Sequence, residues 1–384
     1  MKFHHTGLSF FILISVFSGF IFLQKYSINH PFQFIKPFTK QHNLDHLTVA
    51  DGFKLSIYAD NIPKVRTMVI SQTGDLIISQ PKLGTLQLIL KDDNNDGRSD
   101  GRLLLAQGLN GPYGLALHKG WLYIAETDSV LRIRYNAEQR KLIDTPRTII
   151  SHKFPGGGNH WSRNIKISPD GKLFVSVGSS CNACIENSPK RASILQYDLD
   201  GKNELIFATG LRNTVGFDWQ PKTKLLFGVD NGRDYLGDDI PPEELNQINR
   251  GAHYGWPYEY GEKLVDSDYA KYRPAQLLTT PPIHQLTAHS APLSLLFLKH
   301  DPKLYGTALV ALHGSWNRSK KSGYKVVALS FSDDMKITQR DFISGFERNE
   351  RVTGRPVDIA EDTDGSIYLS DDYNGRIFKA SPIQ

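Results

Sequence analysis

The chain has 384 residues, of which 40% are hydrophobic and 22% are charged, and it contains 32 glycines and 20 prolines. This composition is typical of a soluble, turn-rich globular protein, and the length suits either two domains or one large repetitive β fold. The formal net charge of +5 is spread along the sequence without a long lysine or arginine block, which argues against a dedicated nucleic-acid binder.

The first residues are basic and histidine-containing, and an apolar stretch follows at residues 7–23. Its length lies at the lower edge for a membrane-spanning helix and slightly above the usual core of a signal peptide. Nothing in it alternates with polar residues, so a buried core helix is the less favoured interpretation. We therefore expect residues 1–25 to be a signal peptide or a membrane anchor. The protein is then expected to be exported, either periplasmic or anchored to the membrane and facing the periplasm or the extracellular side.

Residues 26–48 are irregular and polar-aromatic, and we predict a linker there, before a globular body at 49–384. In that body one short theme recurs, namely a turn with Gly, Asp or Lys, then a β-rich run, then an acidic or small residue. The six copies lie at 74–80, 120–127, 171–178, 224–230, 306–312 and 365–372. Turns of the type HKG and PDG join some of them to a preceding strand as hairpins.

Six copies at blade-like spacing predict an all-β, six-bladed β-propeller, in which each four-stranded unit buries its faces against its neighbours. The longest interval leaves room for an insertion around 255–300. No helical pattern long enough for a Rossmann or barrel fold is visible. An irregular β-sandwich is the alternative.

Cys181 and Cys184, in the run SSCNACIEN, are the only cysteines. A C-x-x-C pair is compatible with half a zinc site, a redox pair or a small disulfide. No second Cys/His pair at zinc spacing exists, no histidine follows directly as haem attachment requires, and the surroundings predict a strand and a turn rather than a helix start. We predict a local structural disulfide formed in an oxidising compartment.

His160 follows three glycines, in FPGGGNHWSRN, and precedes a predicted hairpin. The glycines allow unusual turns that would bring the imidazole to a blade edge facing the central funnel, where a histidine can act as a general base near neutral pH. A hydrogen-bonded structural histidine is the alternative. The nearby Asn159 and Arg163, together with a second polar cluster at Arg212, favour the functional interpretation.

Arg212 and Asn213 lie in TGLRNTVGFDW, in a turn that leads into a strand. An arginine there can polarise a carbonyl group and an asparagine can orient a ligand, whereas a salt bridge between blades is the structural alternative. The acidic turns that follow offer the hard oxygen ligands of Ca²⁺. Glu244 and the turn at Gly232 and Arg233 are the preferred calcium ligands. Asp238 and Asp239 are surface-loop alternatives.

Arg318, Lys325 and Arg355 are cations near predicted blade starts. Together they can bind the carboxylates of an anionic cofactor, although each by itself is compatible with a solvated surface charge.

Several motifs in combination carry a family resemblance: GLRNTVGFDWQP, VDNGRDYLGDDIPPEELN, YGWP, HGSWNRS and GRPVDIA. Over about residues 50–380 the chain resembles the glucose/sorbosone dehydrogenases that use pyrroloquinoline quinone (PQQ), and it is more similar to the sorbosone-type branch. The resemblance implies a six-bladed propeller, in agreement with the count of repeats.

The resemblance also implies roles for individual residues. His160 falls where the family has the base that takes the sugar hydroxyl proton, and Arg212 where the family arginine stabilises negative charge at the quinone carbonyl. The resemblance also implies that Asn213, beside Arg212, contacts the cofactor. Arg355 resembles a cation that holds the cofactor's carboxylates. Calcium positions fall on Glu244 and on the carbonyl groups of Gly232 and Arg233.

The sequence departs from the family pattern at two positions near this site. Leu109 stands near a substrate-contacting glutamine of the best-known soluble members, and Asn159 replaces the usual aspartate before the base. The lysine expected on the cofactor is not unique among Lys320, Lys321 and Lys325.

The predicted function is therefore that of a quinoprotein oxidoreductase with PQQ and Ca²⁺, which oxidises an aldose or a sugar aldehyde and passes electrons to an external acceptor. Two alternatives remain at this point. One is a calcium-dependent lactonase or related hydrolase, and the other is a non-catalytic exported propeller that binds glycans or a partner. Fold alone does not separate them.

Overall fold

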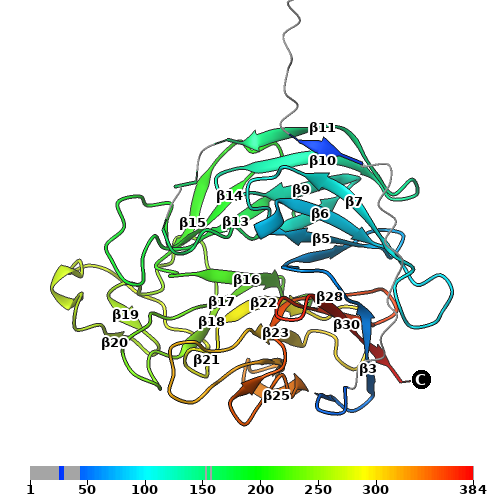
Figure 1. The fold of residues 1–384 in the computed structure, drawn as a ribbon. Coiled ribbons are helices and arrows are strands. Elements are labelled where there is room, and N and C mark those ends of the chain that lie inside the picture. Colours follow the sequence, from blue (N-terminus) through cyan, green and yellow to red (C-terminus); the bar gives the residue numbers. More distant parts are fainter. Residues whose placement is uncertain (1–25, 30–43, 152–153, 156–157, 384) are drawn as a thin grey trace, which may run out of the picture.

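The six recurring β-rich runs form the second strand of six antiparallel sheets, so the predicted six-bladed β-propeller is confirmed. The computed structural model describes residues 26–29, 44–151, 154–155 and 158–383 (Figure 1). The second strands are buried along nearly their whole length. A strand covered on both faces has apolar residues at consecutive positions instead of alternate ones, which explains why these runs stand out in the sequence.

The first three blades follow the chain directly, with the innermost strand first in each. Their strands are β4 (Met68–Ile70), β5 (Leu76–Gln80), β6 (Thr85–Ile89) and β7 (Arg102–Gln107); β8 (Leu115–His118), β9 (Trp121–Ala125), β10 (Val130–Asn136) and β11 (Lys141–Ile150); and β12 (Ile165–Ile167), β13 (Leu173–Val177), β14 (Ser193–Tyr197) and β15 (Leu205–Thr209). A 3-10 turn, η1 (Pro81–Leu83), joins β5 to β6.

The last three blades have the same order, except that the outer strand of the sixth comes from the start of the propeller. Their strands are β16 (Thr214–Trp219), β17 (Leu226–Asp230), β18 (Glu243–Gln247) and β21 (His284–Leu286); β22 (Pro292–Phe297), β23 (Ala308–Leu312), β24 (Lys325–Phe331) and β25 (Ile337–Ser344); and β28 (Pro356–Glu361), β29 (Ile367–Asp371), β30 (Arg376–Pro382) and β3 (Phe53–Ala59).

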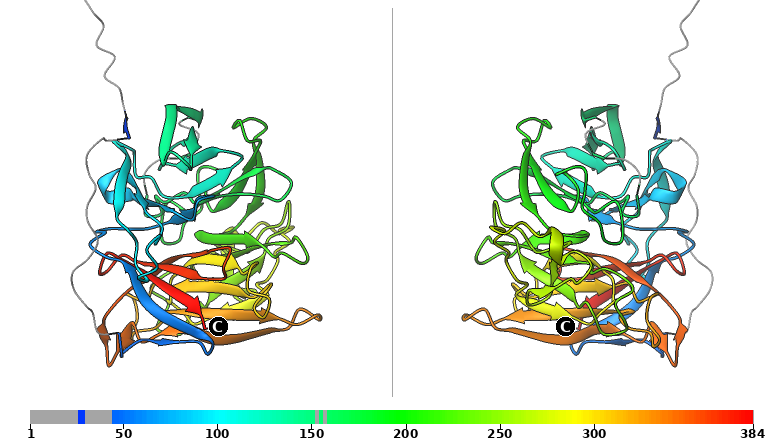
Figure 2. Two further views of the ribbon diagram at one scale, coloured as in Figure 1. Left: turned by 90° about the vertical axis from the view of Figure 1, so that its right-hand side faces the viewer. Right: turned by 90° about the vertical axis from the view of Figure 1, so that its left-hand side faces the viewer.

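The pairing of β3 with β30 closes the ring, because it joins the two ends of the propeller within one sheet. The blue strand β3 lies beside the red strand β30 in Figure 1 and in both views of Figure 2. Two short strands from the segment expected to be a linker also pair with blade edges: β1 (Ser27–Ile28) with β7, and β2 (Thr48–Val49) with β25.

The chain between β18 and β21 carries an insertion, within the region where the spacing of the repeats left room for one. It contains the hairpin β19 (Glu259–Tyr260) and β20 (Leu264–Val265), which projects at the edge of the molecule, and the 3-10 turn η2 (Ala270–Tyr272) (Figure 1). A second small hairpin, β26 (Glu347–Arg348) and β27 (Arg351–Val352), precedes the sixth blade.

The apolar core is divided among the interfaces between blades. Within the described part of the chain, six clusters of buried residues are found, and each joins the facing sheets of two neighbouring blades. No blade has an apolar interior of its own, so each depends on stacking against its neighbours. This dependence fixes how loops of neighbouring blades meet at the ends of the axis, where the site lies.

Candidate active site

The predicted site residues gather at one end of the propeller axis for a topological reason. Each blade begins at this end with its inner strand, and the antiparallel second strand ends there. His160 lies just before β12, Arg212 and Asn213 just before β16, and Arg355 just before β28. Loops that follow β13, β17, β23 and β29 complete the surface. The six-fold repeat therefore places residues far apart in the sequence on one face.

His160 is partly buried, and its hydrogen bonds determine its tautomer. Nδ1 lies 2.9 Å from the carbonyl oxygen of Ser179 and 2.9 Å from its Oγ. The carbonyl oxygen can only accept, and the Ser179 hydroxyl hydrogen is donated to Cys181 O at 2.7 Å. Nδ1 must therefore carry the proton, which leaves the lone pair on Nε2. Nε2 has no hydrogen-bond partner among the residues that the structure describes.

The surroundings of His160 favour its neutral form. Burial and the nearby Arg212 guanidinium lower the pKa of His160 to about 3. Asn213 is close by: a Cβ added to Gly178 would lie 2.5 Å from Asn213 Oδ1 and 2.6 Å from His160 Cβ. Only glycine at position 178 allows these two side chains to approach so closely. A neutral imidazole with a free Nε2 is the form required of a general base.

Arg163, which the sequence placed near the base, is fully buried and supports the loop of His160. Its guanidinium donates to the carbonyl groups of His160 at 2.8 Å, Ser162 at 2.9 Å and Pro155 at 3.1 Å. Asn159 is exposed and donates its backbone N–H to Ser180 O at 3.0 Å. Arg163 therefore positions the backbone around His160 and offers little to a ligand.

Arg212 is also buried, and neutral oxygen atoms hold its guanidinium. Nε donates to Asn182 O at 2.7 Å, Nη2 to Asn182 Oδ1 at 2.9 Å, and Nη1 to Asn231 O at 2.9 Å. The nearest carboxylate oxygen, Oδ2 of Asp234, lies 3.6 Å from Nη2. A guanidinium has five N–H groups, so two of them, one on each terminal nitrogen, make no hydrogen bond with a described residue. Both can bind a ligand, and Nη2 also forms an ion pair with Asp234.

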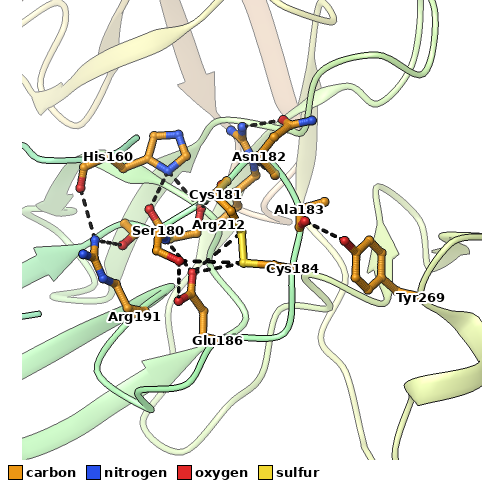
Figure 3. The surroundings of a disulfide bond; sticks show 12 residues. His160, Ser180, Cys181, Asn182, Ala183, Cys184, Glu186, Arg191, Arg212 and Tyr269 are labelled. Carbon is orange, nitrogen blue, oxygen red and sulfur yellow. Dashed lines mark hydrogen bonds between the residues drawn. A yellow bond between two sulfur atoms is a disulfide. The ribbon is translucent and has the colours of Figure 1, made fainter. Parts of the chain in front are cut away.

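Cys181 and Cys184 form a disulfide next to these residues (Figure 3). Together with Glu186 they are the one group of three metal-type side chains that comes close enough to hold an ion within the described residues. Because the two sulfur atoms are bonded to each other, they are not thiolate ligands. The turn between them contacts Arg212 through Asn182.

The three predicted metal ligands, Gly232, Arg233 and Glu244, line one cavity of about 20 Å³. A cavity needs about 10–15 Å³ to hold one water molecule, so there is room here for one small ligand such as an ion. No described residue donates a hydrogen bond to the carbonyl oxygens of Gly232 and Arg233. This cavity is also lined by Arg212, Asp230, Glu259 and Asp266. Most of its lining residues lie between positions 210 and 257. Oxygen-rich walls with free carbonyl groups suit Ca²⁺.

Three carboxylates in and beside this cavity, those of Asp230, Glu243 and Glu244, have raised pKa values. Burial raises the pKa of Asp230 to about 6 and the pKa values of Glu243 and Glu244 to about 8. Glu243 points away from Glu244, as neighbours on a strand do, and accepts from Gly232 N at 2.6 Å and Ala291 N at 3.0 Å. It thereby holds the Gly232 turn, while Glu244 faces the cavity. A cation beside these groups would favour their ionised forms.

The predicted cofactor cations fall into two groups. Arg355 donates to the carbonyl groups of His313 at 3.3 Å and Gly314 at 3.2 Å, with no carboxylate partner among the described residues. In contrast, Arg318 contacts Asp239 Oδ1 at 2.8 Å, and Lys325 contacts Asp341 Oδ1 at 2.8 Å on the outer strand β25. Arg355 thus lies with the inner-strand residues, whereas Arg318 and Lys325 are engaged with carboxylates farther from them.

The structure adds residues that sequence reasoning missed. Arg66 precedes the inner strand β4 of the first blade, as Arg163, Arg212 and Arg355 precede theirs. Asp372 connects it to the sixth blade, since its carboxylate lies 3.3 Å from Arg66 Nη2 and 2.9 Å from His313 Nε2. The recurrence of arginine before inner strands is a signal in the repeat that would have identified Arg66.

The chain matches the TrAA12-like family over residues 47–262 and 266–381, nearly all of the propeller. It belongs to this family. An uncharacterized protein of Borreliella burgdorferi is 33% identical over 355 residues, which cover 87% of this chain and 90% of that protein. A PQQ-dependent sugar dehydrogenase of Hypocrea jecorina is 25% identical over 396 residues, which cover 86% of this chain and 88% of that protein.

Among solved structures, the calcium structure of the Trichoderma reesei carbohydrate-active enzyme of family AA12 has a TM-score of 0.76 at 21% identity. The match covers 88% of this TrAA12-like chain and 97% of that chain, and it shows a shared fold. The resemblance to PQQ-using sugar dehydrogenases that the motifs indicated is confirmed by these findings.

The predicted N-terminal signal or anchor segment lies outside the described residues. Within the part of the chain that the structure describes, no helix is long and apolar enough to cross a membrane.

Proposed function

We propose that this TrAA12-like protein is a PQQ-dependent sugar dehydrogenase that oxidises the CH–OH group of an aldose, to a lactone, or of a hydrated sugar aldehyde, to an acid. The observation that carries the proposal is that a proton acceptor and a cationic hydrogen-bond donor lie next to each other. His160 offers a free Nε2 lone pair, and the buried Arg212 beside it has two N–H groups that make no hydrogen bond with a described residue. A base next to a fixed cation can take a proton while negative charge develops nearby.

The residues present fit PQQ, a planar polycarboxylate with quinone oxygens. Arg355 is a cation whose described partners are neutral carbonyl groups, so its charge is available to an anionic group. Arg212 has two unused N–H groups, and Asn213 lies beside His160. These residues would hold the cofactor. The carbonyl groups of Gly232 and Arg233, with Glu244, would hold Ca²⁺ in the adjoining cavity, where oxygen donors line the wall.

The steps that belong to the chain itself follow from this geometry. Nε2 of His160 accepts the hydroxyl proton of the substrate while Nδ1–H remains bonded to Ser179. Arg212 stabilises the negative charge that develops on the acceptor side of the reaction, because its guanidinium is oriented before the substrate arrives. PQQ, when bound, supplies the two-electron acceptor for the hydride that leaves the substrate carbon. The electrons would pass from there to an external acceptor.

The decisive experiment is reconstitution of the purified apo-protein with PQQ, with and without Ca²⁺. Binding of PQQ is measured by quenching of tryptophan fluorescence, and turnover by dye reduction across a panel of aldoses and sugar aldehydes. Micromolar or tighter binding of PQQ with sugar-dependent dye reduction is expected. Absence of PQQ binding together with lactone hydrolysis in its absence would replace the proposal with the hydrolase alternative.

Export of the protein is part of the same proposal. The Cys181–Cys184 disulfide supports it, because such bonds persist in oxidising compartments. Membrane anchoring through residues 1–25 is proposed on the apolar sequence at 7–23. Fractionation of cells that express the full chain tests both points: recovery in the cytoplasmic fraction contradicts export, and release from the membrane without detergent contradicts anchoring.

A further inference from the structure

Asn182, between the two cysteines of the disulfide, accepts more hydrogen bonds from the Arg212 guanidinium than any other described residue does. Its backbone oxygen accepts from Nε at 2.7 Å and its Oδ1 from Nη2 at 2.9 Å. Oδ1 also accepts from Asp234 N at 2.8 Å, and Nδ2 donates to Asp234 O at 3.1 Å. Two donors face Oδ1 and one acceptor faces Nδ2, so the network fixes the orientation of the amide.

The turn that carries Asn182 is itself held from several sides (Figure 3). The disulfide closes it between Cys181 and Cys184, and Tyr269, from the insertion in blade 4, donates its hydroxyl to Ala183 O at 2.5 Å. On the other side, Ser179 bonds Cys181 O at 2.7 Å and contacts His160 Nδ1 at 2.9 Å. One short segment after β13 therefore contacts both His160 and Arg212.

The kind of contact matters for the chemistry. A hydrogen-bonded carboxylate would neutralise much of the guanidinium's charge, whereas the amide and carbonyl oxygens of Asn182 orient the guanidinium without adding a second carboxylate to Asp234, which lies 3.6 Å from Nη2. Two of the three hydrogen bonds of the Arg212 guanidinium are accepted by Asn182 of the neighbouring blade 3, and the third by Asn231 O of Arg212's own blade 4. Without the Asn182 amide, Nη2 would retain Asp234 Oδ2 as its near neighbour, at 3.6 Å.

We propose that Asn182, presented by the turn that the Cys181–Cys184 disulfide closes, is a positioning residue that sets the orientation of the Arg212 guanidinium. The inference rests on the proposed function, since it concerns the reaction in which Arg212 takes part. Asn182 itself touches neither the substrate nor the reacting atoms in this proposal, and it acts through Arg212.

The first test compares Asn182→Ala with Asn187→Ala in the full-length protein reconstituted with PQQ and Ca²⁺. Asn187 is exposed, lies five positions farther along the same loop, and is not among the described hydrogen-bond or ion-pair partners of the Arg212 guanidinium. Asn182→Ala is expected to lower kcat about 10- to 100-fold, because a small misplacement of a charge-stabilising group is costly. The KM for the sugar should change less than threefold, and Asn187→Ala should stay within about twofold of wild type in both constants.

A double-mutant cycle distinguishes positioning from a general structural defect. Asn182→Ala is measured in the wild-type and in the Arg212→Ala background, by kcat and by the Kd for PQQ from fluorescence quenching. If Asn182 acts through Arg212, it loses most of its effect on both quantities once Arg212 is absent. Equal effects in the two backgrounds, or a kcat of Asn182→Ala within twofold of wild type, would overturn the inference.

The role of the disulfide is tested by the double substitution Cys181→Ser with Cys184→Ser, because a thiol reductant would also react with the dye. The double variant should lower kcat several-fold, and adding Asn182→Ala to it should cost less than it does in wild type. Thermal unfolding followed by circular dichroism shows that the variants are folded. An unchanged kcat contradicts the assignment to the disulfide-closed turn. If the wild type neither binds PQQ nor reduces dye, the proposed function has failed, and the inference fails with it.

Discussion

Two sides of the candidate site hold their charged groups in different ways. Between blades 3 and 4, His160 and Arg212 are bonded to backbone and amide oxygens of neighbouring loops. On the side of blades 5 and 6, two of the predicted cofactor cations are paired with carboxylates, Arg318 with Asp239 and Lys325 with Asp341. Neutral partners fix the direction of a group and preserve its charge or lone pair, whereas carboxylate partners cancel much of the charge.

Arg355 is the exception on the second side, and it clarifies the comparison. Its described partners are the carbonyl groups of His313 and Gly314, so it resembles Arg212 more than it resembles Arg318 or Lys325. The type of partner therefore predicts which cations serve an anionic ligand. Four experiments test this comparison, in order of decreasing effect.

The largest effect is expected for His160→Ala. Loss of the base should lower kcat by about 10²- to 10⁴-fold, while the Kd for PQQ stays within about threefold, since the imidazole acts in the chemical step. Dye reduction and fluorescence quenching measure the two quantities. The control is His300→Ala, an exposed histidine with no role in the site. Equal turnover in His160→Ala and wild type would show that the base has been assigned to the wrong residue.

Arg212→Ala should follow, with kcat lowered by about 10²- to 10³-fold, because a fixed donor at the developing charge is lost. Binding of PQQ should weaken as well, which separates this variant from His160→Ala. Arg212→Lys should recover little, since a lysine cannot reproduce the fork that Asn182 and Asn231 hold. Full recovery by lysine would mean that charge alone matters and that orientation does not.

Arg355→Gln and Lys325→Gln form a matched pair on the second side. Arg355→Gln should raise the Kd for PQQ about tenfold, equivalent to a loss of about 1.4 kcal/mol. Lys325→Gln should change it less than twofold, because Lys325 forms its ion pair with Asp341 on an outer strand. The reverse ranking, measured by fluorescence titration, would break the distinction between neutral and carboxylate partners.

The smallest effect is expected for the pH dependence of kcat/KM, which should be nearly flat on the acid side. Burial and the charge of Arg212 lower the pKa of His160 to about 3, so the neutral base persists as the pH falls and is lost only near pH 3. With Ca²⁺ kept saturating, so that Asp230 and Glu244 stay ionised, kcat/KM should change less than about twofold from pH 7 to pH 5. A base with the ordinary histidine pKa of about 6.5 would lose about 20-fold over that range. An acid limb centred near pH 6.5 that persists at saturating Ca²⁺ would contradict the enclosed position of His160.

Much of the fold was predictable because a buried strand can be recognised from the pattern of its own apolar residues. The six apolar runs are the second strands, whose burial on both faces requires consecutive apolar residues. The candidate site was predictable in part, since His160, Arg212 and the turn at Gly232 lie in motifs with unusual glycine and charge content. Arg66 was missed because its surroundings resemble an ordinary strand start. The contact of Asn182 with Arg212 was missed because 30 positions separate them.

The sequence by itself determined the number of blades, the identity of the polar residues at their starts, and the cysteine pair, since repeat spacing and short motifs are local properties. The tertiary structure decided which of these residues work together. Loops of blades 3 and 4 meet at Arg212 and give its guanidinium neutral hydrogen-bond partners, whereas the pairing of β24 with β25 inside blade 5 gives Lys325 a carboxylate. The physical reason is that charge availability depends on the partner in space, which the residue type and its position along the chain do not specify.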